Sequence, residues 1–227
     1  MHHDRSSPSA NPLIGREAEV REIRAHLIDP TCRLLTLVGP GGMGKTTLAV
    51  HLAADMRAAF PGGVAFVALQ AVHTPDFIAP AIADAIGMTL AGTGEPLAQV
   101  CQYLHDKAYL LVLDNIEHLL AGLDILTTLL HLAPACKLLV TSREALNLRE
   151  EWLYPVPGLA YPQAKAADAP ADYAAVQLFA DRARRVRRDF ALAEQYAGVA
   201  RTCQLVEGLP LALELAATWT KTLRCER

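Results

Sequence analysis

The chain has 227 residues, of which 52% are hydrophobic and 20% are charged, and its formal net charge is −3. A chain of this length and apolar content can bury a substantial core. Extensive disorder is therefore excluded, and one larger domain with a smaller appended one is expected. The small net charge gives no argument for binding nucleic acid or an anionic membrane.

The cysteines and the N-terminus bear on the cellular compartment. The five cysteines are Cys32, Cys101, Cys136, Cys203 and Cys225. They lie far apart, form no CxxC pair and are odd in number, which is typical of buried free thiols in a reducing compartment. Residues 1–12 (MHHDRSSPSANP) lack the apolar stretch of a signal peptide, and no run of about eighteen apolar residues is present. We therefore expect a disordered leader over 1–12 and a soluble, cytoplasmic protein.

The first half of the chain begins with a helix, a strand and a second helix. Residues 16–27 carry apolar side chains at helical spacing among charges, which predicts an amphipathic helix. The apolar run 33–39 predicts a buried strand. A glycine-rich loop follows it, and KTTLAVHLAADM then predicts a helix.

The same alternation continues downstream. Residues 63–69 predict a strand, and 74–87 predict a helix in which Pro80 disturbs the regular pattern. Two further strands are predicted at 109–115 and 137–143, with a helical stretch between them. The segment WLYPVPGL, which follows residue 151, predicts a fifth and less regular strand.

Strands that alternate with helices at this spacing predict βαβ units and a parallel sheet covered on both faces. Residues 162–173 are rich in Ala, Pro and charge, as a connector is, and only helices are predicted beyond them. The glycine-rich loop at 39–47 contains the pattern GxxxxGK[ST], so the expected fold is α/β, a three-layer P-loop NTPase domain over 13–161 with a small all-helical domain over 162–227. Ligands of such sheets bind at the carboxyl ends of the strands.

The loop GPGGMGKTT contains the phosphate-binding pattern GxxxxGK[ST] through Gly39, Gly44, Lys45 and Thr46. Backbone N–H groups and the start of the following helix would cradle the phosphates, and Lys45 would neutralise them. The remaining loop residues assigned to nucleotide binding are Gly41, Gly42, Met43 and Thr47. The alternative is an ordinary glycine turn with a surface lysine.

A metal ligand is expected on a second strand. LLVLD predicts a buried strand that ends in Asp114, which together with the Thr46 hydroxyl would hold Mg²⁺. The next position, where many P-loop ATPases carry a catalytic carboxylate, is Asn115. An amide can orient the attacking water but cannot accept its proton, so slow turnover is expected. Glu117 and His118 are near enough in sequence to substitute.

Arg143 follows the next predicted strand, in the tripeptide TSR. An arginine there could sense the γ-phosphate from the neighbouring strand edge. On spacing alone, a surface arginine at the start of a helix is an equal alternative.

Four segments besides the phosphate loop give the chain a family resemblance: LIGREAEV (13–20), LLVLDNIEH (110–118), LLVTSRE (138–144) and EGLPLALELAA (207–217). In this order they resemble the nucleotide-binding region of STAND-class signalling NTPases, which includes NB-ARC domains. The closest resemblance is to the ATP-binding modules of large bacterial transcriptional regulators. It spans residues 13–217.

The resemblance implies roles for particular residues. Ile14, Gly15 and Arg16 would lie against the adenine base, and Pro210 would be presented to the nucleotide by the helical domain. Arg143 would be the sensor arginine. For Pro210 the alternative is simply a proline in the first turn of a helix.

The resemblance also implies a switch: ADP holds a closed form, and ATP permits an open form that often self-associates. Relatives continue into a winged-helix domain, so the chain is expected to be a truncated module whose sensor and effector domains lie elsewhere. Five arginines at 182–188 are flanked by acidic residues, so they favour a solvated surface over nucleic-acid contact.

Three functions remain open at this point. The first is an ATP/ADP-dependent signalling switch with slow Mg²⁺-dependent ATPase activity. The second is an ordinary P-loop ATPase whose turnover drives mechanical or loading work, and the third is a scaffold in which nucleotide is structural. The residues alone do not separate ATP from GTP, and only the resemblance favours adenine.

Overall fold

In the computed structural model, the described residues are 13–163 and 173–222, so the expected leader and most of the expected connector lie outside them. Contacts divide the described chain into two compact units. We call residues 19–39 and 45–156 the sheet unit, and residues 13–18, 40–44 and 157–222 the helical unit. The middle of the glycine-rich loop therefore groups with the helices.

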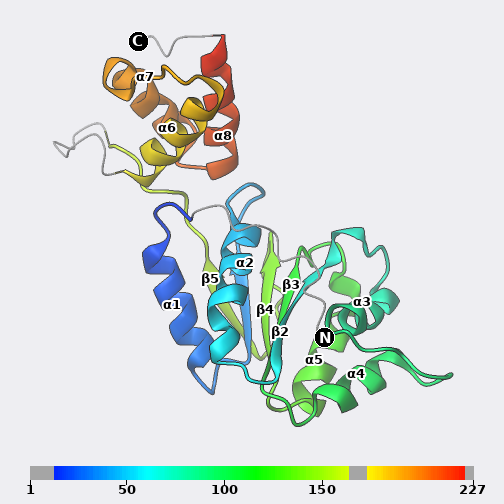
Figure 1. The fold of residues 1–227 in the computed structure, drawn as a ribbon. Helices are drawn as coiled ribbons and strands as arrows, with labels where there is room; N and C mark the ends of the chain where they lie inside the picture. Colours follow the sequence, from blue (N-terminus) through cyan, green and yellow to red (C-terminus); the bar gives the residue numbers. More distant parts are fainter. Residues whose placement is uncertain (1–12, 164–172, 223–227) are drawn as a thin grey trace. The chain divides into compact units, whose positions relative to one another are not determined.

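The sheet unit is built on a five-stranded sheet in which every neighbouring pair is parallel. The strands are β1 (Leu34–Val38), β2 (Gly63–Ala68), β3 (Tyr109–Asp114), β4 (Lys137–Ser142) and β5 (Glu151–Pro155). Their order is β2-β3-β4-β1-β5 (Figure 1). The predicted parallel sheet is confirmed, and β4 lies between β1 and β3.

Helices cover the sheet. They are α1 (Glu17–Ile28), α2 (Lys45–Asp55), α3 (Ile78–Ala85), α4 (Pro96–Leu104) and α5 (Asp124–Leu132). One apolar cluster joins α3, α4 and α5 to alternate residues of β3 and β4, such as Leu111 and Val140. Figure 1 shows these three helices grouped on the side away from α1. Helix α4 was not predicted, although Val100, Cys101 and Leu104 bury its inner face.

The predicted helix over 74–87 forms as two pieces. A 3-10 turn, Pro75–Phe77, leads directly into α3, which places Pro80 in the first turn of the α-helix. Proline is tolerated there because the first N–H groups of a helix have no intrahelical acceptor. Pro80 therefore does not interrupt α3, because it stands where the helix begins.

The helical unit contains α6 (Ala174–Val186), α7 (Leu192–Leu205) and α8 (Pro210–Thr218). Their shared core includes Phe179, Val199, Cys203 and Leu213, all at most 1% exposed. The prediction that only helices follow the connector is confirmed for the described residues.

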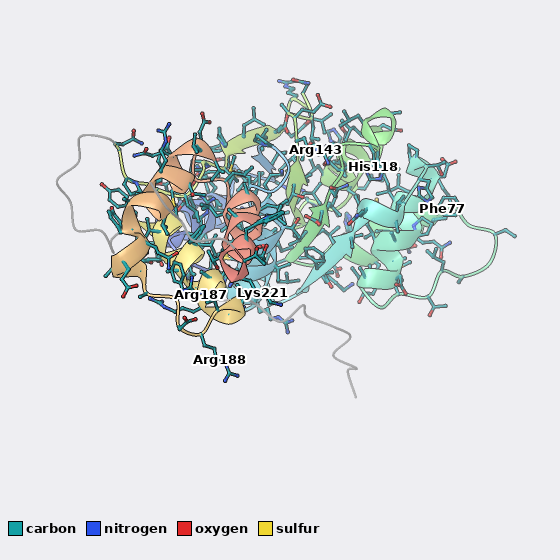
Figure 2. The ribbon with its side chains drawn as sticks, turned by 90° about the horizontal axis from the view of Figure 1, so that it is seen from above. Phe77, His118, Arg143, Arg187, Arg188 and Lys221 are labelled. Atoms are coloured by element: carbon teal, nitrogen blue, oxygen red, sulfur yellow. The ribbon has the colours of Figure 1, made fainter. Side chains whose placement is uncertain are left out.

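Several arginines of α6 and the turn after it are engaged within the helical unit. Arg182 pairs with Asp181 and Glu214, Arg185 pairs with Asp181, and Arg187 pairs with Asp189. Arg188, by contrast, extends away from the unit in Figure 2. Acidic partners thus already neutralise much of the positive charge that the sequence concentrates here.

Across residues 13–163 and 173–222, no helix combines the length and the apolar character that a membrane crossing requires.

Candidate functional site

The strand order brings the segments that follow β1 and β3 to the end of β4. The backbone N–H of Gly39, directly after β1, donates to the carbonyl of Ser142 over 3.4 Å. On the other side, the N–H of Ile116 donates to the carbonyl of Thr141 over 3.2 Å. The end of β4 therefore fixes both segments that the sequence predicts to bind nucleotide and metal.

Lys45 is the first residue of α2. Its Nζ donates to the carbonyl of Gly39 over 2.7 Å, which holds the ammonium beside the loop. Burial lowers the pKa of Lys45, and the Arg143 guanidinium lowers it further, while the carboxylates of Glu117 and Asp114 oppose this shift. The ammonium thus lies within electrostatic reach of three of the charged residues that follow β3 and β4.

Thr46 and Asp114 form the expected oxygen pair, and a third residue joins them. Oδ1 of Asp114 accepts hydrogen bonds from the hydroxyl of Thr46 over 2.8 Å and from that of Thr141 over 2.6 Å. Asp114 is only 9% exposed. Sequence reasoning missed Thr141, and the signal available was a hydroxyl residue one position before the end of a buried strand.

This donor set fits Mg²⁺. The ion prefers hard oxygen ligands and is usually held by one or two carboxylates together with substrate phosphates and water. Thr46 and Asp114 supply one hydroxyl and one carboxylate, already within hydrogen-bonding distance of each other. Within the described ranges, no cluster of three or more His, Cys, Asp or Glu residues could hold a metal by itself. An ion here would therefore depend on phosphate oxygens.

Asn115 leaves β3 with an unusual backbone. Its φ is +67°, in the left-handed region that asparagine tolerates better than most residues. Its N–H donates to Oγ1 of Thr141 over 2.9 Å. Thr141 therefore binds both the Asp114 carboxylate and the backbone of the next residue.

The two substitutes considered for a catalytic carboxylate point to different partners. Oε1 of Glu117 lies 2.9 Å from Nε of Arg143. Nε2 of His118 lies 2.7 Å from the carbonyl oxygen of Val72. Figure 2 labels His118 and Arg143, which lie on neighbouring parts of the sheet unit. Arg143 is thus an exposed arginine that is paired with an acidic residue of the site. No helix begins in the described residues between β4 and β5, so the helix start that the surface alternative expected is wrong.

The middle of the glycine loop is held within the helical unit. The N–H of Leu211, at the start of α8, donates to the carbonyl of Gly42 over 3.1 Å. Gly42 has φ +80°, and a Cβ there would lie 2.8 Å from Cβ of Leu211. The Pro210 ring lies 3.9 Å from where a Cβ of Gly44 would stand. Position 42 therefore requires glycine both for its backbone and for this close approach.

The LIGRE segment contacts the same loop. Arg16 is 4% exposed, and its Nη2 donates to the carbonyl of Met43 over 3.2 Å. Gly15 has φ +65°, and a Cβ there would lie 2.1 Å from Cβ of Ala174. Ile14 packs against the apolar core of the helical unit.

The predicted residues thus fall into two groups. Lys45, Thr46, Asp114 and Arg143 lie in the sheet unit, whereas the helical unit contains Ile14, Gly15, Arg16, Gly42, Met43, Gly44 and Pro210. Gly41 and Thr47, the two other loop residues, are exposed.

Comparison with known proteins identifies relatives of two kinds. An uncharacterised Mycobacterium tuberculosis protein is 38% identical over 213 residues, which cover 93% of this chain and 51% of that protein. A second M. tuberculosis protein, provisionally named an HTH-type transcriptional regulator, is 33% identical over 193 residues. That match covers 84% of this chain and 20% of the relative. The chain therefore spans about half the length of the first relative and a fifth of the second.

A solved structure with the same fold is the STAND protein with a tetratricopeptide repeat sensor from Pyrococcus horikoshii. It matches with a TM-score of 0.56 at 18% identity, covering 93% of this chain and 31% of that chain. At this identity the likeness shows the fold alone, that of P-loop AAA+ ATPases. The sequence profile of the AAA domain family matches residues 28–146, more than half of the chain. The chain belongs to the AAA domain family.

Proposed function

We propose that the chain is an ATP/ADP-binding signal-transduction switch with slow Mg²⁺-dependent ATPase activity, which serves a bacterial transcriptional regulator. The observation that carries the proposal is the hydrogen-bonded set of Thr46, Asp114 and Thr141 at the strand ends, with the Lys45 ammonium nearby. This arrangement supplies a cation for phosphates and hard oxygens for a magnesium ion.

The start of α2 supports the proposed nucleotide binding. The N–H groups of a helix N-terminus and its partial positive charge favour phosphate, and Lys45 adds a full charge at the same place. Thr46 and Asp114 would hold Mg²⁺, which neutralises charge on the transferred phosphoryl group when bound. The other residues of the glycine loop would orient the phosphates through their backbone.

The resting rate is expected to be slow. Asn115 directly follows the metal-binding aspartate, and an amide cannot take the proton of the attacking water. Slow hydrolysis keeps ATP bound for a long time, which suits a protein whose output depends on which nucleotide is bound.

Two contacts inside the helical unit support a coupling between nucleotide and helices. Leu211 of α8 binds Gly42, and Arg16 binds Met43, so the loop that would cradle phosphates is hydrogen-bonded to two segments that flank the sheet domain in sequence. A ligand that prefers one arrangement of this loop shifts the population of the arrangements of α8. We propose that ADP and ATP differ in this preference, and that self-association belongs to the ATP form.

The relationship to a provisionally named HTH-type regulator supports the regulatory setting. Sensor and effector functions would then reside in parts of the protein outside this chain, and a membrane role is not proposed.

The first experiment is to purify the protein without added nucleotide, denature it, and identify and quantify any nucleotide released. Phosphate release with ATP and Mg²⁺ is then measured at steady state. We expect near-stoichiometric ADP and barely detectable turnover, both abolished by Lys45→Ala but not by Lys107→Ala, a lysine whose Nζ contacts Tyr103 and Asp106. EDTA should suppress the turnover.

The other outcomes separate the rival functions. Brisk turnover from an initially empty site would favour an ordinary ATPase that performs mechanical or loading work. If Lys45→Ala changed neither nucleotide affinity nor any conformational response, nucleotide would be structural and the switch would be wrong.

A further inference from the structure

Burial and hydrogen bonds hold the backbone of the turn that carries Glu117, directly after β3. Ile116 and Leu119, on either side of it, are 0% and 1% exposed, and the N–H of Leu119 donates to the carbonyl of Ile116 over 2.8 Å. Residues 115 and 116 are in turn hydrogen-bonded to Thr141 of β4. The backbone around Glu117 is therefore fixed to the same strand end that holds Asp114.

The side-chain contacts separate Glu117 from His118. A proton acceptor for water must have a free lone pair directed at the reacting group. His118 is turned to the carbonyl of Val72, which lies just after the β2 strand. Glu117 instead faces the charged residues of the site: its side chain is 15% exposed, and its carboxylate contacts Arg143 and acts on the ammonium of Lys45.

We propose that Glu117 is the catalytic carboxylate of the slow ATPase and that Arg143 is the positioning residue that holds it. The inference rests on the proposed function. In the step, the oxygen of water forms a bond to the γ-phosphorus while the bond from that phosphorus to the bridging oxygen breaks. The bridging oxygen takes the electron pair and leaves with ADP, and Glu117 accepts the proton that the water loses.

The pairing with Arg143 holds the Glu117 carboxylate reversibly. Nε of Arg143 binds Glu117, yet the Arg143 side chain is 66% exposed. An ion pair of this exposure is weak, so it opens readily. A γ-phosphate competes for the same guanidinium because phosphate binds arginine strongly. Arg143 therefore places the carboxylate at the site until the γ-phosphate is bound, and a variant without this arginine loses that placement.

The test compares Glu117→Gln with Glu144→Gln, the same change at an exposed glutamate next to Arg143. Single-turnover hydrolysis of ATP with Mg²⁺ is measured, together with the affinities for ATP and ADP. Because a general base contributes about 10²–10⁴-fold, Glu117→Gln should lower the rate about 100-fold and change each affinity less than about threefold. Glu144→Gln should match the unaltered protein within about twofold.

Arg143→Gln tests the positioning role. It should lower the hydrolysis rate on its own, but the double variant with Glu117→Gln should be no slower than Glu117→Gln alone. A merely structural role for Arg143 would make the two losses multiply. Glu117→Asp, which keeps a carboxylate, should hydrolyse ATP faster than Glu117→Gln. The comparison of these two rates tests the role of the carboxylate even if one variant is less stable.

The outcomes distinguish this inference from the proposed function. If the unaltered protein binds and hydrolyses ATP and Glu117→Gln does so at the same rate, the role of Glu117 is overturned and the switch stands. If the unaltered protein binds ADP but never hydrolyses ATP, both the slow ATPase and the role of Glu117 are wrong.

Discussion

Asp114, the last residue of β3, and Glu117, in the turn after it, are carboxylates held in different ways. Asp114 is 9% exposed and accepts bonds from two neutral hydroxyls, Thr46 and Thr141. Glu117 is held by one charged partner, Arg143, whose side chain is 66% exposed. The Thr141 hydroxyl, in a residue that is only 2% exposed, fixes the carboxylate in one place, because a short buried side chain has few other positions to adopt and no water to compete. A long exposed arginine fixes its partner only part of the time.

This contrast matches the chemistry expected of each group. A metal ligand must keep its geometry through the reaction, whereas a proton acceptor needs to approach the attacking water only when ATP is bound. The molecule thus places its rigid contacts where the metal would bind and its reversible contact where the proton would move.

The largest expected effect comes from removing the charge of the rigid carboxylate. Asp114→Asn should reduce ATP hydrolysis at least about 100-fold, because the stabilisation that a bound metal gives the transition state is worth several kcal/mol. An amide oxygen still accepts the two hydroxyl donors, so the melting temperature should change little. Asp106→Asn, at an aspartate whose side chain is 83% exposed, is the matched control. Mg²⁺-dependent ATP affinity unchanged in Asp114→Asn would contradict the metal assignment.

A smaller effect is expected when the rigid carboxylate keeps its charge but loses a donor. Thr141→Val leaves the Asn115 N–H and one lone pair of Asp114 without a partner, which costs about 1–3 kcal/mol of unfolding free energy. Thr141→Ser keeps the hydroxyl and should recover most of that loss. Urea unfolding of the unaltered protein and the two variants measures the free energy of unfolding. Equal losses of this free energy in Thr141→Val and Thr141→Ser would show that packing of the methyl group matters more than the hydroxyl.

The smallest effect on stability is expected at the reversible contact. Arg143→Ala should change the unfolding free energy by less than about 1 kcal/mol, as is usual for exposed ion pairs, and the difference should shrink further in high salt. The same unfolding measurement serves here. A loss greater than that of Thr141→Val would reverse the comparison between the two carboxylates.

Much of the sheet could be predicted from the sequence because its strands are short apolar runs. All six residues of β3 are buried, so its pattern has no polar interruption. The glycine-rich loop is equally clear in the sequence, and its assignment to phosphate stays a prediction that rests on glycine, lysine and hydroxyl residues at fixed spacing. Asp114 and Arg143 followed because each stands at or just past the end of such a run.

What the sequence could not predict depends on strand order and on packing between distant segments. The role of Thr141 requires β4 to lie between β1 and β3, and no local pattern encodes that order. Helix α4 was missed because its apolar face is short and includes a cysteine. The choice between Glu117 and His118 depends on Arg143 and Val72, which lie at least 25 residues away from both in the chain.

The position of β1 also has a consequence for synthesis of the protein. Its two neighbours, β4 and β5, are both made much later: Leu34 pairs with Leu138 on one side and with Glu151 on the other. During translation the strand that carries the phosphate loop has no partner until residues near 138 have left the ribosome. Long-range pairing of this kind slows folding. The proposed nucleotide site therefore cannot form on the early nascent chain, because it is complete only after β4 has been inserted.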